Sequence, residues 1–414
     1  MAKNPEIEAR KALFAKMKKE HYTLLIPDMC PIHFDLMSLL IQRRFGITPI
    51  VVTPLGREAK DAGLTAVHND SCYPVIITCG AFLAELRKGN YDLNRTAVII
   101  SQTGGGCRAS NYLSLFKKAF EKEFPTVPVI SINFSGLSKD SSLPLSLGFI
   151  RELYQAVLYG DFLMNLEMQS RAYYPEEEVL ALTKECLEDL KKQVGHASFY
   201  KTKKNYQAIL DRYMKFNPPA KRKPRVGIVG EIYVKYSPYA NNHLCDYLFH
   251  AGVEPTLPSL NEFVLYCMKN YFIDNEYYGR NRLIMPFLRP FYKHCIKKTR
   301  KCAEMLKGTN FLPYSDFEEV VACGKKVIDL GVKMGEGWVI PAEMVDYATH
   351  GVENIVVVQP FGCLPNHIVG KGMIRPVKEL CPNANIVPLD FDASSTSVNQ
   401  ENRLKLMLSN IQGE

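Results

Sequence analysis

The sequence lacks the cysteine and glycine spacings that most often mark a metal or a nucleotide site. No C-x-x-C pair occurs among its 12 cysteines, which argues against zinc-finger and thioredoxin chemistry. The cysteine spacing of ferredoxins is also absent. The glycine-rich segment 103–109 fits neither G-x-G-x-x-G nor G-x-x-x-x-G-K-[ST], which argues against a phosphate-binding loop.

Long hydrophobic runs are also missing. The longest apolar runs, such as residues 22–27 and 354–360, are far shorter than the ~20 residues of a membrane span. The first 20 residues have no apolar core of signal-peptide type and predict an exposed amphipathic helix. We therefore expect a cytoplasmic protein, with no membrane and no nucleic acid among its partners, since no nucleic-acid motif is found.

What is present is an ordinary globular composition. The chain has 414 residues, 47% hydrophobic and 23% charged, which predicts two domains with their own cores. The net charge of +8 is modest, and the lysine-rich segments 201–204, 221–223 and 297–301 are typical of solvated helix faces and a linker.

The first half alternates short apolar runs with helical stretches. Such continuous apolar strands between helices predict a parallel α/β sheet. The expected strands are residues 22–27, 47–53, 96–101 and 127–134, and the expected helices lie around 33–44, 74–89 and 110–122.

The second half repeats this alternation after a helical region at 150–216 and a proline-rich, charged boundary at 217–227. Its expected strands are residues 226–234, 253–259, 325–332, 354–360 and 385–391, and its expected helices are 241–252, 261–308 and 399–411. The predicted fold is α/β, with two doubly wound, mostly parallel-sheet domains, helical insertions and a cleft between the domains. The predicted boundaries are 1–150 for the N-terminal domain, 151–220 for the helical connection and 221–414 for the C-terminal domain, with an insertion at about 261–308.

Four unusual segments follow predicted strands directly: residues 27–34, 101–112, 230–242 and 359–367. In open α/β sheets, ligands bind at the carboxyl ends of the strands. The recurrence of such segments in both halves predicts a site in the cleft between the domains.

The segment "TGGGCRASNY" combines Gly104, Gly105 and Gly106 with Cys107 and Arg108. Contiguous glycines free the backbone N–H groups to point inward, an arrangement that suits sulfide ligands and anionic clusters. Two alternatives remain open here. One is a thiol nucleophile whose pKa Arg108 lowers, and the other is a tight turn with a buried cysteine.

Up to four cysteines share one context, in which a strand ends, a turn with glycine or proline follows and a helix begins. They are Cys30, Cys72, Cys107 and Cys363. A helix N-terminus stabilises a thiolate, so dispersed ligands of this kind fit a cluster held in a crevice. Seven further cysteines fit apolar or helical patterns and are expected to be buried core residues: Cys79, Cys186, Cys245, Cys267, Cys295, Cys302 and Cys381.

The combination of "HNDSCYP", "SQTGGGCRASNY", "GEIYVKYSP", "GVKMGEGW" and "QPFGCLPNHIVGKGMI" resembles the 2-hydroxyacyl-CoA dehydratase superfamily. The resemblance is to the C-terminal region of the large activase-related proteins, and it covers roughly residues 20–412. The superfamily also includes double-cubane cluster proteins. Its members bind oxygen-sensitive iron–sulfur clusters between two α/β domains and receive electrons from an ATP-hydrolysing activase.

The resemblance implies Cys72, Cys107 and Cys363 as cluster ligands, with Cys30 and Cys323 as weaker candidates. It implies a [4Fe–4S] cluster or a larger double-cubane cluster. Arg108 and Lys235 are candidates for neutralising cluster or substrate charge, and surface solvation is the alternative role of Lys235. Arg108, Lys235 and His367 are also the candidates for catalytic residues. Asn366 and His367 are candidates for donors around the ligands, or ordinary helix-start residues.

Three functions stay open at this stage. The first is an iron–sulfur protein that accepts low-potential electrons for a difficult reduction or a radical-type dehydration, as a reductase or a dehydratase-like lyase. The second is a binding, assembly or electron-transfer module, and the third is a metal-free thiol enzyme that uses Cys107. The candidate partners are an iron–sulfur activase, a small-molecule or acyl-CoA substrate and a second copy of the chain.

Overall fold

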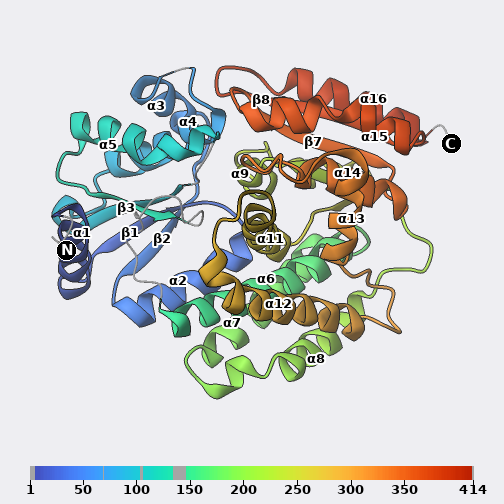
Figure 1. Ribbon diagram of the computed structural model, residues 1–414, viewed down its shortest axis with the longest axis horizontal. Coiled ribbons are helices and arrows are strands. Elements are labelled where there is room, and N and C mark those ends of the chain that lie inside the picture. The colour runs from blue at the N-terminus through green and yellow to red at the C-terminus, as the bar shows by residue number, and fades with distance from the viewer. Residues whose placement is uncertain (1–4, 69, 103–105, 134–145, 413–414) are drawn as a thin grey trace.

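The computed structural model describes residues 5–68, 70–102, 106–133 and 146–412 (Figure 1). Two four-stranded sheets form the framework, with strand orders β2-β1-β3-β4 and β6-β5-β7-β8, and all strands are parallel. The strands are β1 (Thr23–Pro27), β2 (Thr48–Val52), β3 (Thr96–Gln102), β4 (Val129–Asn133), β5 (Arg225–Gly230), β6 (Glu254–Thr256), β7 (Asn354–Pro360) and β8 (Asn385–Phe391). The predicted fold class is confirmed.

Helices cover both sheets and fill the connection between them (Figure 1). They are α1 (Pro5–Lys19), α2 (Pro31–Phe45), α3 (Glu58–Ala66), α4 (Tyr73–Arg87), α5 (Tyr112–Glu123), α6 (Leu147–Arg171), α7 (Glu176–Gln193), α8 (Thr202–Tyr213), α9 (Ile232–Tyr236), α10 (Leu244–His250), α11 (Leu260–Tyr278), α12 (Met285–Met305), α13 (Phe317–Val327), α14 (Val339–Thr349), α15 (Ile374–Leu380) and α16 (Val398–Gln412). The 3₁₀ turns are η1 (Leu93–Arg95), η2 (Arg108–Asn111), η3 (Ala197–Tyr200), η4 (Met214–Phe216) and η5 (Arg282–Ile284), and η6 (Asn366–Lys371) is a π-helical turn. In the described parts of the chain, no helix combines the length and apolar character that crossing a bilayer requires.

Two predicted strands are wrong. The strand expected at 226–234 ends at Gly230, because the Glu231 side chain accepts a hydrogen bond from the Val234 N–H (2.8 Å) and starts α9. The strand expected at 325–332 is instead the end of α13 followed by turns. Its apolar residues fit a buried helix end as well as they fit a strand, an ambiguity common to short apolar runs.

The central strands are buried on both faces, as parallel sheets covered by helices require. Leu24 and Leu25 of β1 are fully buried, and so is the run Ile355–Val358 of β7. The sheets place β1 beside β3 and β5 beside β7 at their centres. Each sheet therefore has a point between two central strands where loops leave in opposite directions, which is where open α/β sheets bind ligands.

The two α/β halves pack directly on each other through apolar side chains. The ring of Tyr73, at the start of α4, stacks on Phe391 at the end of β8, with 6.4 Å between ring centroids. The Tyr73 hydroxyl donates to the carbonyl oxygen of Ala240 at 3.0 Å. Buried residues of both halves belong to one continuous core, so the loops at the two sheet edges are held at a common interface.

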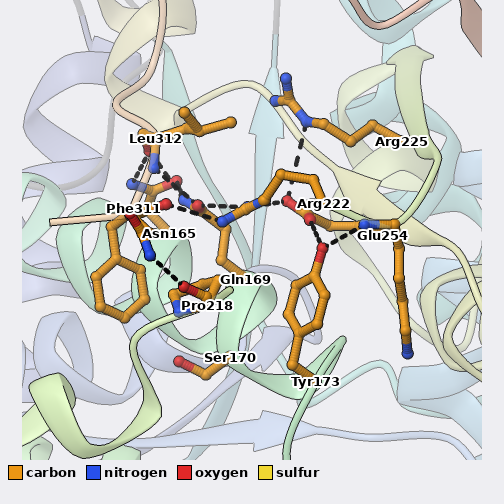
Figure 2. Close-up of polar contacts among 12 residues, drawn as sticks. Asn165, Gln169, Ser170, Tyr173, Pro218, Arg222, Arg225, Glu254, Phe311 and Leu312 are labelled. Carbon is orange, nitrogen blue, oxygen red and sulfur yellow. Dashed lines mark hydrogen bonds and ion pairs between the residues drawn. The ribbon is translucent and has the colours of Figure 1, made fainter. Parts of the chain in front are cut away.

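The helical connection is fastened to the second sheet by a buried polar network (Figure 2). Arg222 donates to Oε1 of Gln169 on α6 at 2.8 Å and pairs with the fully buried Glu254 of β6. The Tyr173 hydroxyl donates to Glu254 at 2.8 Å, and the Arg225 guanidinium lies 3.9 Å from the same carboxylate. Arg222, Tyr173 and Arg225 approach the buried carboxylate from different sides. Together they fix the orientation of the helical connection relative to the second sheet.

Candidate functional site

The loops at the carboxyl ends of the central strands carry most of the predicted site residues. Cys107 follows β3 and Cys363 follows β7. Cys72 differs from the prediction, because helix α3 precedes it rather than a strand. It is the N-cap residue of α4, so its thiol still lies at the start of a helix.

The loops of Cys72 and Cys363 are in direct contact, although they belong to different halves. The Tyr73 N–H donates to the carbonyl oxygen of Phe361 at 3.0 Å. Gly362 has φ +73°, and a Cβ there would lie 3.2 Å from the Cα of Cys72. This close approach and the left-handed backbone both favour glycine before Cys363.

Cys107 reaches the same interface from the loop after β3. It is the N-cap residue of η2, where its Sγ accepts from the N–H of Ala109 at 3.5 Å. Gly335 lies against it, since a Cβ at Gly335 would come within 3.8 Å of the Cys107 Sγ and 3.1 Å of Pro365. Gly106 lies against the Met334 side chain, whereas Gly104 and Gly105 fall outside the described residues.

A hydrogen-bonding group contacts each of the Cys72, Cys107 and Cys363 sulfurs. The Tyr112 hydroxyl lies 2.8 Å from the Cys72 Sγ, and Nδ2 of Asn366 donates to the Cys363 Sγ at 3.2 Å. The nearby charges of Cys72 and Cys107 both contribute to raising the pKa of Tyr112, after burial. Tyr112 is therefore a common neighbour of two cysteines, and Asn366 is confirmed as a donor beside the third.

Two buried glutamates border the cysteines, and the sequence analysis missed both as site residues. The Glu336 carboxylate accepts from the N–H of Ile232 at 3.1 Å and from Nδ2 of Asn366 at 3.4 Å. Burial, followed by the charge of Glu336, raises the pKa of Glu231 to about 8. The only available signal was a glutamate in each of the motifs "GEIYVKYSP" and "GVKMGEGW", and a helix cap explains Glu231 equally well.

The environments of Cys72 and Cys363 favour the neutral thiol. Burial raises the pKa of Cys72 from its ordinary value of 9.0, although the hydrogen bond from Tyr112 opposes that shift. Burial, with the charges of Glu336 and Glu231, also raises the pKa of Cys363. An activated nucleophile needs the opposite shift, so neither thiol has the environment of a catalytic nucleophile.

The two weaker ligand candidates are Cys30, on the loop after β1, and Cys323, on α13. Cys30 is 2% exposed, has φ +47° and donates its N–H to the carbonyl oxygen of Tyr236 at 3.1 Å. The charges that act on its pKa come from Asp161, Lys235 and Asp28. Cys323 lies on α13 in the apolar core of the second half.

The candidate polar residues Arg108, Lys235 and His367 differ in their exposure to solvent. Arg108 is exposed beside Cys107, and its charge lowers the pKa of Cys72. Surface solvation of Lys235 is wrong, because this side chain is 6% exposed and its Nζ lies 3.1 Å from Oε1 of Glu343. The His367 side chain is exposed, with Nδ1 2.5 Å from Nε2 of Gln359.

Within the described residues, no three His, Cys, Asp or Glu side chains form a group that could hold a single metal ion. No protein-family model matches the chain, and no curated protein matches its sequence. The site is therefore defined by its own geometry, in which three cysteines on three loops meet where the two halves of the molecule pack together.

Proposed function

We propose that the chain is an iron–sulfur protein that accepts low-potential electrons from an ATP-dependent activase for a difficult reduction or a radical-type dehydration. The observation that carries the proposal is the meeting of the Cys72, Cys107 and Cys363 loops at one interface. These loops come from both halves of the chain, as the family resemblance implies for a cluster held between two α/β domains.

The donor set suits a cluster better than a single ion. The thiolates of a cubane bind different irons, so their sulfurs need not converge on one point. N–H and O–H groups that donate to sulfur raise the potential of a cluster, and Ala109, Tyr112 and Asn366 provide one to each cysteine. When bound, a [4Fe–4S] or double-cubane cluster would supply one-electron reduction at low potential.

The chain's own residues would bind and shield the group. Cys72, Cys107 and Cys363 would supply the thiolates, which form because a positively charged metal displaces the thiol proton. Tyr112 and Asn366 would orient two of the sulfurs. The apolar packing of Tyr73 on Phe391 would keep water from one side of the site.

A partner face lies beside these cysteines and supports the activase part of the proposal. Four large apolar side chains are exposed here. Phe361 (50%), Leu364 (50%) and Ile368 (48%) belong to the Cys363 loop and the π-helical turn after it, and Met334 (41%) lies against Gly106. Exposed apolar groups that gather in one place are typical of sites where another protein docks. An electron donor bound here would lie close to the proposed ligands.

Anaerobic purification followed by iron and sulfide analysis tests the proposal. We expect a coloured protein whose iron content falls in the Cys72→Ser, Cys107→Ser and Cys363→Ser variants. The Cys186→Ser variant is the matched control, because Cys186 lies in the apolar core of α7. A wild-type protein that stays free of iron after anaerobic reconstitution would falsify the proposal.

The same preparations separate the competing functions. Addition of a cognate activase, ATP and a reductant should bleach the visible spectrum of an electron acceptor. An iron-loaded protein whose spectrum does not respond would instead be an assembly or storage module. Activity lost in the Cys107→Ser variant, in a protein that never contains iron, would identify a thiol enzyme.

A further inference from the structure

A second site lies away from the cysteines, in a pocket between the helical connection and the second half. The pocket has a volume of about 380 Å³, within the ~300–1,000 Å³ typical of small-molecule sites. Helix α6, the segment 255–258, the loop 312–316 and helix α14 form its walls. Much of the wall is apolar and includes Met164, Met168, Leu257, Leu312 and Val352.

Three buried acids line one part of this pocket. Glu262, Glu343 and Asp346 have exposures of 6%, 4% and 2%. The Nζ of Lys235 lies 3.1 Å from Glu343. Ser315 donates to Oδ2 of Asp346 at 2.5 Å, and Nδ1 of His350 lies 3.2 Å from Oδ1 of the same carboxylate.

Four polar atoms of residues that line the pocket have no hydrogen-bond partner within the described residues. Two of them lie near an oppositely charged group: Oδ1 of Asp346 is 3.2 Å from Nδ1 of His350, and Nε of Arg225 is 3.9 Å from Glu254. The other two are Oε1 of Glu262 and the hydroxyl of Tyr347, and both side chains are more than nine-tenths buried. Burying an acceptor or a hydroxyl without a partner is costly, and native structures seldom leave such groups unmatched. Both residues line the same pocket, so one ligand could contact both atoms.

We propose that this pocket binds a small organic ammonium ion, with its N–H groups on Oε1 of Glu262 and the hydroxyl of Tyr347 and its hydrocarbon part on the apolar wall. The three buried acids outnumber the cations beside the pocket, which are Lys235 and the lining Arg225, and Arg225 also lies 3.9 Å from Glu254. This excess of acids favours a cation over an anion. The three acids do not form a group that could hold a metal ion, and a bare ion would leave the apolar wall empty. An amine with a hydrocarbon chain satisfies both parts of the pocket.

Burial also changes the pKa of the acid that would contact the ammonium ion. Burial, followed by the negative charge of Glu343, raises the pKa of Glu262 well above its ordinary value, while Lys235 opposes the shift and Asp346 adds to it. Glu262 therefore keeps its proton to a higher pH than an ordinary glutamate does. An ammonium ion that contacts its carboxylate would displace this proton, so binding would release one proton to the buffer.

Calorimetric titration of the full, anaerobically purified chain with n-pentylamine tests the proposal, with 1-pentanol as the neutral analogue of the same shape. We expect the amine to bind at least about tenfold more tightly than the alcohol, because one hydrogen bond to a charged group accounts for a difference of that size in affinity. The observed binding enthalpy should change with the ionisation enthalpy of the buffer, as proton release requires. Equal affinities for amine and alcohol, or no heat from the amine, would overturn the proposal.

Three variants locate the site. Glu262 is the third residue after Ser259, the N-cap of α11, where glutamine is as favourable as glutamate, so Glu262→Gln should keep the helix intact. This variant should weaken amine binding about tenfold and abolish proton release. Tyr347→Phe removes only the unpartnered hydroxyl, so it should weaken binding severalfold without lowering the melting temperature. The exposed Glu353→Gln is the charge-matched control. Unchanged amine affinity in both pocket variants would overturn the assignment, and it would leave the proposed cluster untouched because the cysteines are not involved.

Discussion

The backbone N–H of Tyr73 donates to the carbonyl oxygen of Phe361, with 3.0 Å between the two atoms. One residue follows Cys72 and the other precedes Cys363 by two positions, so this single bond joins the two halves of the proposed site. The stability of the interface and the geometry of the site are therefore linked, and the first prediction tests that link.

Gly362→Ala should loosen the contact between the Cys72 and Cys363 loops. Alanine pays about 1–2 kcal/mol for the left-handed backbone at φ +73°, and its Cβ would also lie 3.2 Å from the Cα of Cys72. Gly56→Ala is the matched control, since Gly56 has φ +61° and nothing within 4 Å of the added Cβ. Urea unfolding should show the larger loss for Gly362→Ala, together with a loss of iron, and equal losses would contradict the prediction.

Tyr112→Phe should remove the donor to the Cys72 sulfur and leave the ring packing intact. We expect a loss of about 1 kcal/mol in the free energy of unfolding. The potential of the bound cluster should become more negative, because a donor to sulfur is lost. Tyr174→Phe, whose hydroxyl donates to the carbonyl oxygen of Asn217, should lose similar stability without moving the potential measured by redox titration.

Asp161→Asn should destabilise the junction between α6 and α11. The Asp161 carboxylate accepts from the backbone N–H groups of Leu260 and Asn261 at 2.7 and 2.9 Å, and lies 2.9 Å from Nε2 of the fully buried His33. Hydrogen bonds to a charged group predict a loss of about 2–3 kcal/mol in the free energy of unfolding. The control Asp211→Asn, at an exposed position, should change the free energy of unfolding by less than about 0.5 kcal/mol. Equal effects of the two substitutions would contradict a stabilising role for the Asp161 hydrogen bonds.

Arg222→Gln should weaken the attachment of the helical connection to the second sheet. Glu254 would lose its closest cationic partner and keep only Tyr173 and the more distant Arg225. Removing one member of a buried ion pair predicts a loss on the order of 2–4 kcal/mol. Arg375→Gln, at a surface pair with Glu379, should lose less than about 1 kcal/mol in the same chemical denaturation experiment.

The pH dependence of stability should change in the Glu262→Gln variant. Because the pKa of Glu262 is raised above its ordinary value of 4.5, the unfolded chain releases this proton first. The stability that Glu262 contributes below that value is then lost as the pH rises toward the raised pKa, at up to about 1.4 kcal/mol per pH unit. Unfolding measured at several pH values should show a smaller decline for the variant, and parallel curves would contradict the assigned shift.

The sequence predicted most of the strands. Both NIVVVQP and NIVPLDF match β7 and β8 residue for residue, because strands buried on both faces appear as continuous apolar runs. Cys107 and Cys363 follow central strands as expected. A shared local context grouped Cys72 with these two cysteines. The contact between the three loops itself depends on how two domains pack, which no local pattern specifies.

Local pattern could not predict the buried charges. Glu231 occurs within an apolar segment and suggested a continuing strand, whereas its carboxylate caps α9. Lys235 lies four residues later, and its burial depends on Glu343 of α14, which is distant in the sequence. The unpartnered oxygen of Glu262 likewise arises from long-range packing, so nothing in the neighbouring residues indicates it.

The division of the three cysteines between the two halves also sets the order in which the site is made. During synthesis Cys72 and Cys107 leave the ribosome long before Cys363, while the first sheet can already form around them. The proposed ligand set would be complete only after the last sheet has folded and docked. Acquisition of a cluster would then report that the whole chain has reached its native state, and a truncated or misfolded chain would remain unloaded.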